Sequence, residues 1–380
     1  MILNYTATCL FGLEGLLGEE IEALGYERIE NIDGRITFRG DEYAAARCSV
    51  NLRYAERLYL HVGAFEATTF TELFDGTKEL PWEDYIGKDD EFPVSGHSIK
   101  SKLFSVPDCQ KIIKKAISVR LGEKYSLTRL PETGTRYKIE FFLFKDKANL
   151  MIDLSGVPLH KRGYRPETVD APIRETLAAA MVKLARPREN VLLWDPFCGS
   201  GTIAIEAAMM MRNIAPGLKR SFAAEQYPIF PADSWTQARE EAETKINRDT
   251  QFEAYATDIN DDCVRIAEES AKRAGVADMI SVFKMDALDI DTLGKRGTIV
   301  TNPPYGDRLL TIEEAESLYR AMGVAFARLE KWQIYVITQS EVFPKLYGRR
   351  ADKIRKLYNG MIPCYYYQFF KNQDQKKQTE

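Results

Sequence analysis

A glycine-rich turn separates an apolar stretch from a stretch with helical spacing. The segment reads Val191-Leu-Leu-Trp-Asp-Pro-Phe-Cys-Gly-Ser-Gly-Thr-Ile-Ala-Ile-Glu. Glycines let the backbone approach a ligand closely, because no Cβ stands in the way. The N–H groups of such a loop and of the helix that follows it favour negative ligand groups. We therefore predict a cofactor-binding loop at Gly199–Gly201.

Two classes of cofactor fit a turn of this kind. A dinucleotide needs three small residues to seat its pyrophosphate, and Gly199, Gly201 and Ala204 match that pattern. S-adenosylmethionine has no phosphate and instead needs carboxylates at several strand ends. Asp195 directly precedes the turn, where a carboxylate would repel a pyrophosphate but can reach the methionine ammonium, directly or through water. This position favours S-adenosylmethionine.

Two further acids follow predicted strands. Asp258 ends the strand predicted at 252–257, where a carboxylate can hold both ribose hydroxyls, and Asp286 ends the next strand, where it can accept from the adenine amine. Asp258 lies 57 residues after Gly201, against ~20 in a dinucleotide unit. We assign the excess to an insertion around residues 211–232, which is rich in proline and aromatic residues. A single aspartate here is as readily a strand-end cap, but three in strand order favour the cofactor.

The tetrapeptide Asn302-Pro-Pro-Tyr305 directly follows the strand predicted at 298–301. Asn302 Oδ1 and the Pro303 carbonyl can accept both hydrogens of an exocyclic amine and hold its nitrogen in line with a sulfonium methyl. The prolines fix the backbone, and Tyr305 can stack on a base swung out of its helix. Such catalysis depends on positioning and dipoles. The competing interpretation is a proline-stiffened turn with a buried asparagine.

The elements that position these residues form a doubly wound α/β domain. From Arg174 onward, apolar strands alternate with helices, which indicates a largely parallel sheet. The predicted strands are 191–194, 252–257, 280–284, 298–301, 332–338 and 362–370.

The first half of the chain has a different, α+β pattern. A strand at 3–10, a helix at 13–24, a hairpin around Asp33-Gly34, a helix at 41–51 and a strand at 57–65 predict a ferredoxin-like unit. A second α+β segment covers 66–155, with helices at 69–80 and 108–121 and strands at 91–96, 137–144 and 147–153.

Composition limits the kind of partner. The formal net charge is −4, so any nucleic acid must bind to local basic patches. One such patch lies between Lys100 and Lys124 and a second at His160–Arg165, where an RNA strand could cross between domains; the basic residues at 349–356 are interpreted as an ordinary surface. The six cysteines form no C-x-x-C pair, so we predict no metal site. Scattered cysteines are typical of proteins in the reducing cytoplasm, which is the predicted location. No apolar run approaches the ~20 residues that cross a membrane.

These motifs resemble those of a known family. Asp195-Pro-Phe-Cys-Gly-Ser-Gly-Thr and Asn302-Pro-Pro-Tyr-Gly-Asp-Arg-Leu are similar to the class I methyltransferases that modify exocyclic amines. Gly12-Leu-Glu and Asp153-Leu-Ser-Gly-Val-Pro-Leu-His-Lys-Arg-Gly-Tyr-Arg narrow the resemblance to THUMP-containing RNA guanine-N2 methyltransferases, a group often labelled adenine-specific DNA methylases. Phe197 stands where bacterial relatives often have methionine.

The resemblance implies a Rossmann-like class I methyltransferase domain preceded by ferredoxin-like and THUMP regions. It places a ferredoxin-like unit at 1–65, an overlapping THUMP RNA-binding domain at 45–155, a basic linker at 156–173, the methyltransferase domain at 174–371 and a disordered tail at 372–380.

Candidate site residues follow from the motifs and the resemblance together. The catalytic set is Asn302, Pro303, Pro304 and Tyr305. The set for S-adenosylmethionine is Asp195, Phe197, Cys198, Gly199, Ser200, Gly201, Thr202, Asp258, Ile259, Asp286, Ala287 and Asn302. The set for RNA is Lys100, Lys102, Lys111, Lys114, Lys115, His160, Lys161, Arg162, Tyr164 and Arg165.

The leading hypothesis is a methyltransferase that makes N2-methylguanosine in 23S ribosomal RNA. A tRNA guanine-N2 enzyme and an adenine-N6 enzyme acting on DNA or RNA are alternatives, because the tetrapeptide serves any exocyclic amine. The long N-terminal extension favours structured RNA over DNA. An RNA-binding module with an inactive methyltransferase domain is the non-enzyme alternative, and it would show decayed motifs. The sequence predicts that the protein has no membrane partner, and it does not determine the oligomeric state.

Overall fold

The computed structural model describes residues 1–165, 173–306 and 311–370, which divide into two units. The first unit comprises Met1–Cys9, Leu17–Leu159 and Ser221–Glu240. The second comprises Leu10–Leu16, His160–Arg220 and the residues after Glu240. The tail predicted to be disordered, 372–380, lies outside the described residues.

One sheet of seven strands runs through the whole first unit, in the order β2-β3-β1-β4-β7-β6-β5. Its strands are β1 (Ile2–Thr8), β2 (Glu27–Ile32), β3 (Arg35–Asp41), β4 (Arg57–Glu66), β5 (Val94–Ile99), β6 (Ile139–Phe144) and β7 (Lys147–Asp153). All neighbours are antiparallel except β5 and β6. Because β4 pairs with β1 on one side and with β7 on the other, it is shared by the ferredoxin-like and THUMP parts.

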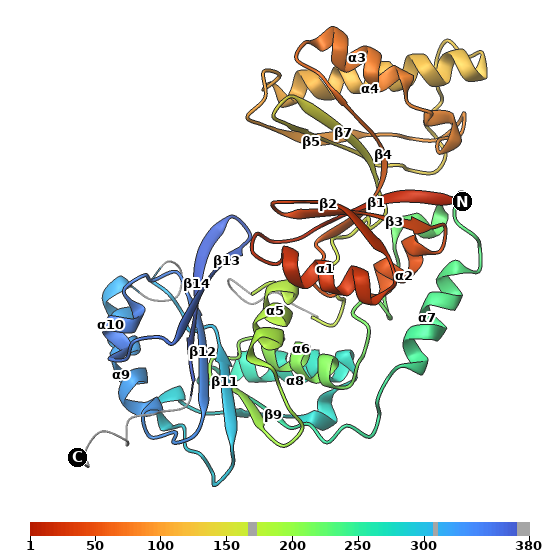
Figure 1. Cartoon of the computed structure of the whole chain (residues 1–380). Helices are drawn as coiled ribbons and strands as arrows, with labels where there is room; N and C mark the ends of the chain where they lie inside the picture. The colour runs from red at the N-terminus through yellow and green to blue at the C-terminus, as the bar shows by residue number, and fades with distance from the viewer. Residues whose placement is uncertain (166–172, 307–310, 371–380) are drawn as a thin grey trace. The chain divides into compact units, whose positions relative to one another are not determined.

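The helices of the amino-terminal half are α1 (Glu14–Ala23), α2 (Ala44–Asn51), α3 (Phe70–Glu79) and α4 (Val106–Tyr125). A capping box fixes the start of α3, where Thr69 accepts from the Glu72 N–H and Glu72 accepts from the Thr69 N–H. Helices α3 and α4 pack against each other beside the THUMP strands (Figure 1).

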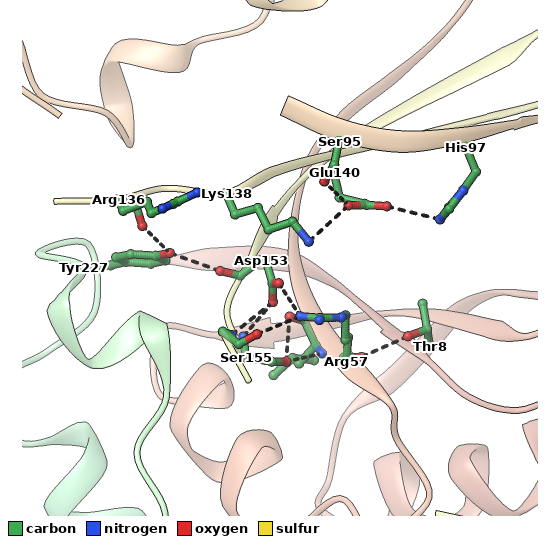
Figure 2. Close-up of polar contacts among 12 residues, drawn as sticks. Thr8, Arg57, Ser95, His97, Arg136, Lys138, Glu140, Asp153, Ser155 and Tyr227 are labelled. Carbon is green, nitrogen blue, oxygen red and sulfur yellow. Dashed lines mark hydrogen bonds and ion pairs between the residues drawn. The ribbon is translucent and has the colours of Figure 1, made fainter. Parts of the chain in front are cut away.

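Residues 221–240 belong to the first unit, although in the sequence they lie between two segments of the second unit. The Ala224 N–H donates to the Leu154 carbonyl at 3.1 Å. Tyr227 stacks on Tyr137, with ring centroids 4.2 Å apart. Its hydroxyl contacts the Arg136 and Asp153 carbonyl oxygens, each at 3.1 Å (Figure 2). The predicted insertion therefore has a structural role in the amino-terminal half, which its spacing alone did not indicate.

The second unit holds the doubly wound sheet, in the order β10-β9-β8-β11-β12-β14-β13. Its strands are β8 (Leu192–Asp195), β9 (Ala254–Asp258), β10 (Ile280–Lys284), β11 (Gly297–Thr301), β12 (Gln333–Thr338), β13 (Lys353–Asn359) and β14 (Ile362–Phe369). The five strands from β10 to β12 are parallel, and β14 and β13 are antiparallel to their neighbours. The predicted fold class is confirmed.

The helices of the carboxyl-terminal half are α5 (Glu175–Ala185), α6 (Thr202–Met211), α7 (Ser234–Thr244), α8 (Asp261–Ala274), α9 (Ile312–Phe326) and α10 (Phe343–Tyr347). An aromatic core that includes Trp194, Tyr319 and Trp332 packs around β8, β11 and β12. No helix in the described ranges is long and apolar enough to cross a membrane.

Strand β13 was not predicted from the sequence. Its residues Lys353, Arg355 and Lys356 suggested only a basic surface. Because β13 is the edge strand of the sheet and Lys353 and Ile354 are exposed, it lacks the continuous apolar run that marks a central strand.

Substituting Gly297 with alanine is expected to destabilise the sheet that carries the site. A Cβ at Gly297 would lie 2.2–2.4 Å from three ring carbons of buried Trp332. Overpacking of this kind typically costs about 1–3 kcal/mol, and chemical denaturation would measure it. Gly15→Ala is the matched control, because a Cβ there meets nothing within 4 Å in helix α1. Equal stability of the two variants would contradict the packing described.

Candidate functional site

Four predicted site residues lie at the carboxyl ends of four adjacent strands. Asp258 and Asp195 end β9 and β8, while Asp286 and Asn302 follow β10 and β11 by one or two residues. Since these strands are parallel neighbours, their carboxyl ends meet at one edge of the sheet. The chain order reverses between β8 and β11, and doubly wound folds bind ligands at such a point.

The glycine turn after β8 has backbone angles that favour glycine. Gly199 has φ +51° and Gly201 has φ +76°, both in the left-handed region. A Cβ at Gly201 would also lie 3.0 Å from the Ala267 Cβ of α8, so this residue allows α6 to start close to α8. A Cβ at Gly199 would meet nothing within 4 Å, which leaves room above the turn for a ligand.

Each of the three aspartates accepts a hydrogen bond from the N–H two residues further on. Asp195 accepts from Phe197 at 3.2 Å, Asp258 from Asn260 at 3.0 Å and Asp286 from Leu288 at 2.9 Å. The strand-end caps considered as the alternative are therefore present. They do not exclude a cofactor role, because each carboxylate has about four acceptor positions.

Asp258 also connects β9 to the glycine turn. Its Oδ2 accepts from the Gly199 N–H at 3.0 Å, and the Thr257 carbonyl accepts from the Cys198 N–H at the same distance. The carboxylate predicted to hold the ribose thus also holds the loop predicted to lie against the cofactor.

Asp195 is almost completely buried, with 1% of its surface exposed. Burial raises the pKa of this carboxyl to about 7, with the nearby Asp258 adding to the rise and hydrogen bonds opposing it. The Thr301 hydroxyl donates to Asp195 Oδ1 at 2.7 Å. A cationic group placed at this carboxylate would favour its ionised form.

The remaining cofactor candidates differ in exposure. Ile259 is 64% exposed and forms an apolar surface beside Asp258, while Asp286 is exposed at the next strand end. Phe197 packs against the aromatic core. Cys198, Ser200, Thr202 and Ala287 are buried, so they contribute to the shape of the turn and of the β10 end.

Two tyrosine hydroxyls hold the loop Asn302–Tyr305, which the sequence predicts to bind the methyl acceptor and which we call the acceptor loop. Tyr305 Oη donates to Asn302 Oδ1 at 2.6 Å, and burial raises the Tyr305 pKa, so the hydroxyl stays protonated. Tyr319 Oη donates to the Pro304 carbonyl at 3.3 Å and lies 2.9 Å from Thr338 Oγ1. The first contact gives Tyr305 a role in orienting Asn302, beyond the predicted stacking on a base.

Thr301, Tyr319 and Thr338 were not among the residues predicted from the sequence. Tyr319 follows Ala315 and precedes Met322 and Phe326 on the buried face of α9. A polar hydroxyl among apolar helix positions was the available signal, because a buried tyrosine hydroxyl usually has a hydrogen-bond partner.

The predicted basic residues near α4 have two kinds of surroundings. Lys100, Lys102, Lys111 and Lys115 are exposed. Lys114 instead lies 3.6 Å from the centroid of the Phe92 ring and pairs with Glu132 at 2.5 Å. Phe104, which sequence reasoning passed over, is 81% exposed next to the first two lysines.

The predicted RNA patch at 160–165 needs correction. Arg162 and Tyr164 are buried and contact Glu206 of α6 at 3.5 and 3.1 Å. Arg165 pairs with buried Glu175 at 2.5 Å. Arg162 and Arg165 are therefore paired with buried carboxylates and are not available to RNA phosphates, whereas the Lys161 side chain is exposed and His160 is partly exposed.

The cysteines do not form a reactive centre in the described residues. All six are free thiols. Burial raises the Cys198 pKa, so this thiol beside the glycine turn is not a thiolate nucleophile. Across the described ranges, no cluster of three or more His, Cys, Asp or Glu side chains is arranged to hold a metal ion.

Three family models match the chain. The model described as "RMKL-like, methyltransferase domain" matches residues 162–368. The "RlmL ferredoxin-like domain" model matches residues 4–59, and the THUMP domain model matches residues 67–153.

Two similar proteins come from Bacillus subtilis and Psychromonas ingrahamii. The chain is 45% identical to "Putative RNA methyltransferase YpsC" of B. subtilis over 98% of both chains. It is 32% identical to the P. ingrahamii "Ribosomal RNA large subunit methyltransferase K/L" over 96% of this chain but 49% of that protein. The chain therefore spans about half the length of the K/L enzyme.

Two solved structures have the same fold. A predicted N6-adenine-specific DNA methylase from Listeria monocytogenes is 45% identical, with a TM-score of 0.91 over 98% of this chain and 97% of that one. SMU.472, which was crystallised in complex with SAH, is 40% identical, with a TM-score of 0.91 over 97% and 98% of the two chains.

The raised pKa of Asp195 predicts a pH-dependent difference in stability between the wild type and Asp195→Asn. A folded-state pKa near 7, above the unfolded value of 3.8, means that this carboxyl stabilises the fold most below about pH 4. This contribution to the free energy of unfolding decreases by about 1.4 kcal/mol per pH unit and is lost as the pH rises through 7. It amounts to a few kcal/mol in total.

Denaturation between pH 4 and pH 8 would measure this difference. The wild type is expected to lose stability relative to Asp195→Asn as the pH rises, whereas the exposed-site control Asp286→Asn is expected to follow the wild type. A constant difference between wild type and Asp195→Asn across this range would contradict the raised pKa.

Proposed function

The chain belongs to the RlmL-like, THUMP-containing methyltransferases, and from this we propose that it transfers a methyl group to the N2 amine of a guanine in 23S ribosomal RNA. It is an S-adenosylmethionine-dependent RNA methyltransferase. The placement of Asn302–Tyr305 at the β11 end, next to the Asp195 carboxylate and the glycine turn of β8, supports an exocyclic amine as the methyl acceptor. The choice of a guanine in ribosomal RNA is supported by the THUMP region and by the name of the K/L relative.

The cofactor residues fit S-adenosylmethionine better than a dinucleotide. The space above Gly199, the exposed Ile259 beside Asp258 and the buried carboxylate of Asp195 suit a ligand with a cationic amino acid, a ribose and an apolar face. When bound, S-adenosylmethionine supplies an electrophilic methyl group on a sulfonium. We propose that Asp195 receives the ammonium, Asp258 the ribose hydroxyls and Asp286 the adenine amine.

The acceptor loop positions the amine. Asn302 Oδ1 has two lone pairs, and the Tyr305 hydroxyl occupies one of them. We propose that the other accepts one amine hydrogen while the Pro303 carbonyl accepts the second. The Tyr319 contact to Pro304 holds the backbone of this loop. Both amine hydrogens are then directed away from the lone pair that attacks the methyl, so the loop works by positioning and dipoles.

The choice of RNA depends on the amino-terminal half. A THUMP region favours structured RNA over DNA, and the K/L relative is named for large-subunit ribosomal RNA. We propose that the phosphates of the RNA substrate contact four exposed lysines, Lys100, Lys102, Lys111 and Lys115. A tRNA guanine is the second candidate. The adenine-N6 reaction is the third and matches the label of the Listeria protein.

We retain two further proposals from the sequence. The domain boundaries at 1–65, 45–155, 156–173 and 174–371 stay as proposed, with 221–240 packed in the first unit. The cytoplasm is the proposed location, where RNA and S-adenosylmethionine are available.

Asn302→Ala is expected to lower the rate of methyl transfer while leaving cofactor affinity almost unchanged. Removal of one positioned polar group typically costs ~10²–10³ in rate. Single-turnover transfer to ribosomal RNA from tritium-labelled S-adenosylmethionine would measure the rate, and calorimetry would measure cofactor binding. A near-normal rate would mean that Asn302 has only a structural role.

Asp258→Ala is the complementary variant, with the opposite pattern. Charge-assisted hydrogen bonds contribute ~1.5–3 kcal/mol each, so cofactor affinity should fall by at least ~10-fold. RNA affinity should change by less than about twofold, because the phosphate contacts that dominate it are elsewhere. A folded variant with unchanged cofactor affinity would exclude the ribose role.

A further inference from the structure

The sheet of the first unit has a cavity of about 410 Å³ on its surface. This volume falls within the ~300–1,000 Å³ typical of small-ligand sites. The cavity is lined by Thr8, Arg35, Arg57, Tyr59, His97, Lys138, Glu140, Phe141, Phe142 and Met151. All of these residues belong to the first unit, and none was predicted from the sequence as a binding residue.

Strand register brings the lining residues together in rows across the sheet. Thr8 of β1 lies opposite Arg35 of β3 on one side and Arg57 of β4 on the other. Glu140 of β6 lies opposite Met151 of β7, and Phe142 lies opposite His97 of β5. The site is therefore built on regular strands, which hold side chains more precisely than loops do.

The floor of the cavity is apolar and aromatic. Tyr59, Phe142 and Met151 form a separate hydrophobic cluster on this sheet. The Arg35 guanidinium stacks over the Phe142 ring, with its carbon 3.4 Å from the ring centroid. Its Nε is buried and has no hydrogen-bond partner among the described residues. Burial lowers the pKa of Arg35 to about 10, so a positive charge with little access to water remains here at neutral pH.

The cavity lining contains further charged groups, and Figure 2 shows the polar contacts that they make. Lys138 and His97 each approach the Glu140 carboxylate at 3.7 Å, and Ser95 donates to the same group at 2.7 Å. Arg57 pairs with buried Asp153 at 2.5 Å and donates to the Gly156 carbonyl. The lining thus carries the cations Arg35, Arg57 and Lys138, of which Arg57 pairs with Asp153 and Lys138 with Glu140, and Glu140 can also accept hydrogen bonds from a ligand.

We propose that this cavity binds one unstacked ribonucleotide of the RNA substrate, with its phosphate near Arg57 and Lys138 and its base stacked on the Arg35 guanidinium plane, which covers the Phe142 ring. The assignment rests on the proposed function of the chain as an RNA methyltransferase. Arginine planes and aromatic rings stack on bases exposed in single strands. Glu140 can accept from a ribose hydroxyl or a base N–H, which a site for inorganic phosphate alone would not need.

The geometry favours a single strand over a duplex. A base paired within an A-form helix has no free face, so it cannot stack on the Arg35 guanidinium. The exposed lysines of α4 can contact phosphates in either form of RNA. The two surfaces should therefore respond differently to the structure of the RNA.

Fluorescence anisotropy with the full chain tests this assignment. The probes are a labelled tetraribonucleotide and a blunt 12-base-pair RNA duplex. The variants are Arg35→Gln and the more exposed Lys138→Gln, with Lys115→Gln on α4 as a control of equal charge change. We expect Arg35→Gln to weaken tetranucleotide binding by at least ~10-fold and Lys138→Gln by ~3-fold. Both should change duplex binding by less than about twofold, and Lys115→Gln should not discriminate between the probes.

Equal losses for both probes, or no loss in Lys138→Gln with its thermal stability retained, would overturn the assignment. Tighter binding of a free nucleoside monophosphate than of the tetranucleotide would assign the cavity to a free nucleotide and also overturn it. Methyl transfer by the wild type is measured in parallel. Transfer without the selective losses refutes only the cavity, whereas selective losses without transfer to any RNA refute only the proposed function.

Discussion

The hydrogen bond between Thr301 and Asp195 joins the two strand ends that carry the proposed reaction site. Thr301 is the last residue of β11, directly before the acceptor loop, and Asp195 is the last residue of β8, directly before the glycine turn. Both side chains are buried, where a hydrogen bond is stronger than in water. The paired residues of β8 and β11 end at Trp194 and Ile299. The side-chain hydrogen bond therefore holds the two strand ends together beyond the last backbone pair. In the proposed mechanism, the distance between the methyl donor and the amine acceptor depends on this hydrogen bond.

The amino-terminal half is organised by a comparable shared element. Strand β4 pairs with β1 and with β7, so the ferredoxin-like and THUMP parts form one continuous sheet. The cavity lies on strands from both parts, which means that neither part alone would form it. Residues 221–240, which separate α6 from β9 in the sequence, complete this unit through Tyr227.

The sequence was most informative where short-range patterns decide structure. A buried strand followed by glycines or prolines located Asp195 and Asn302 at strand ends, and the end of an apolar stretch located Asp258. The sequence did not predict the role of Tyr319, because the contact between Tyr319 and Pro304 depends on how α9 packs on the sheet. The prediction of an RNA-binding patch at 160–165 was wrong for Arg162 for a related reason. The sequence shows how many basic residues the stretch contains, but the burial of Arg162 against Glu206 depends on tertiary packing. The cavity arises from pairing between distant strands and had no local signal.

Nucleoside mass spectrometry of 23S ribosomal RNA and tRNA is the most direct test of the proposed activity. The RNA would come from cells with the gene, cells without it, and cells complemented with the wild type or with Asn302→Ala. The account predicts that N2-methylguanosine disappears from one position of 23S RNA without the gene and returns only with the wild type. Unchanged N2-methylguanosine, with loss of N6-methyladenosine from RNA or DNA instead, would contradict it.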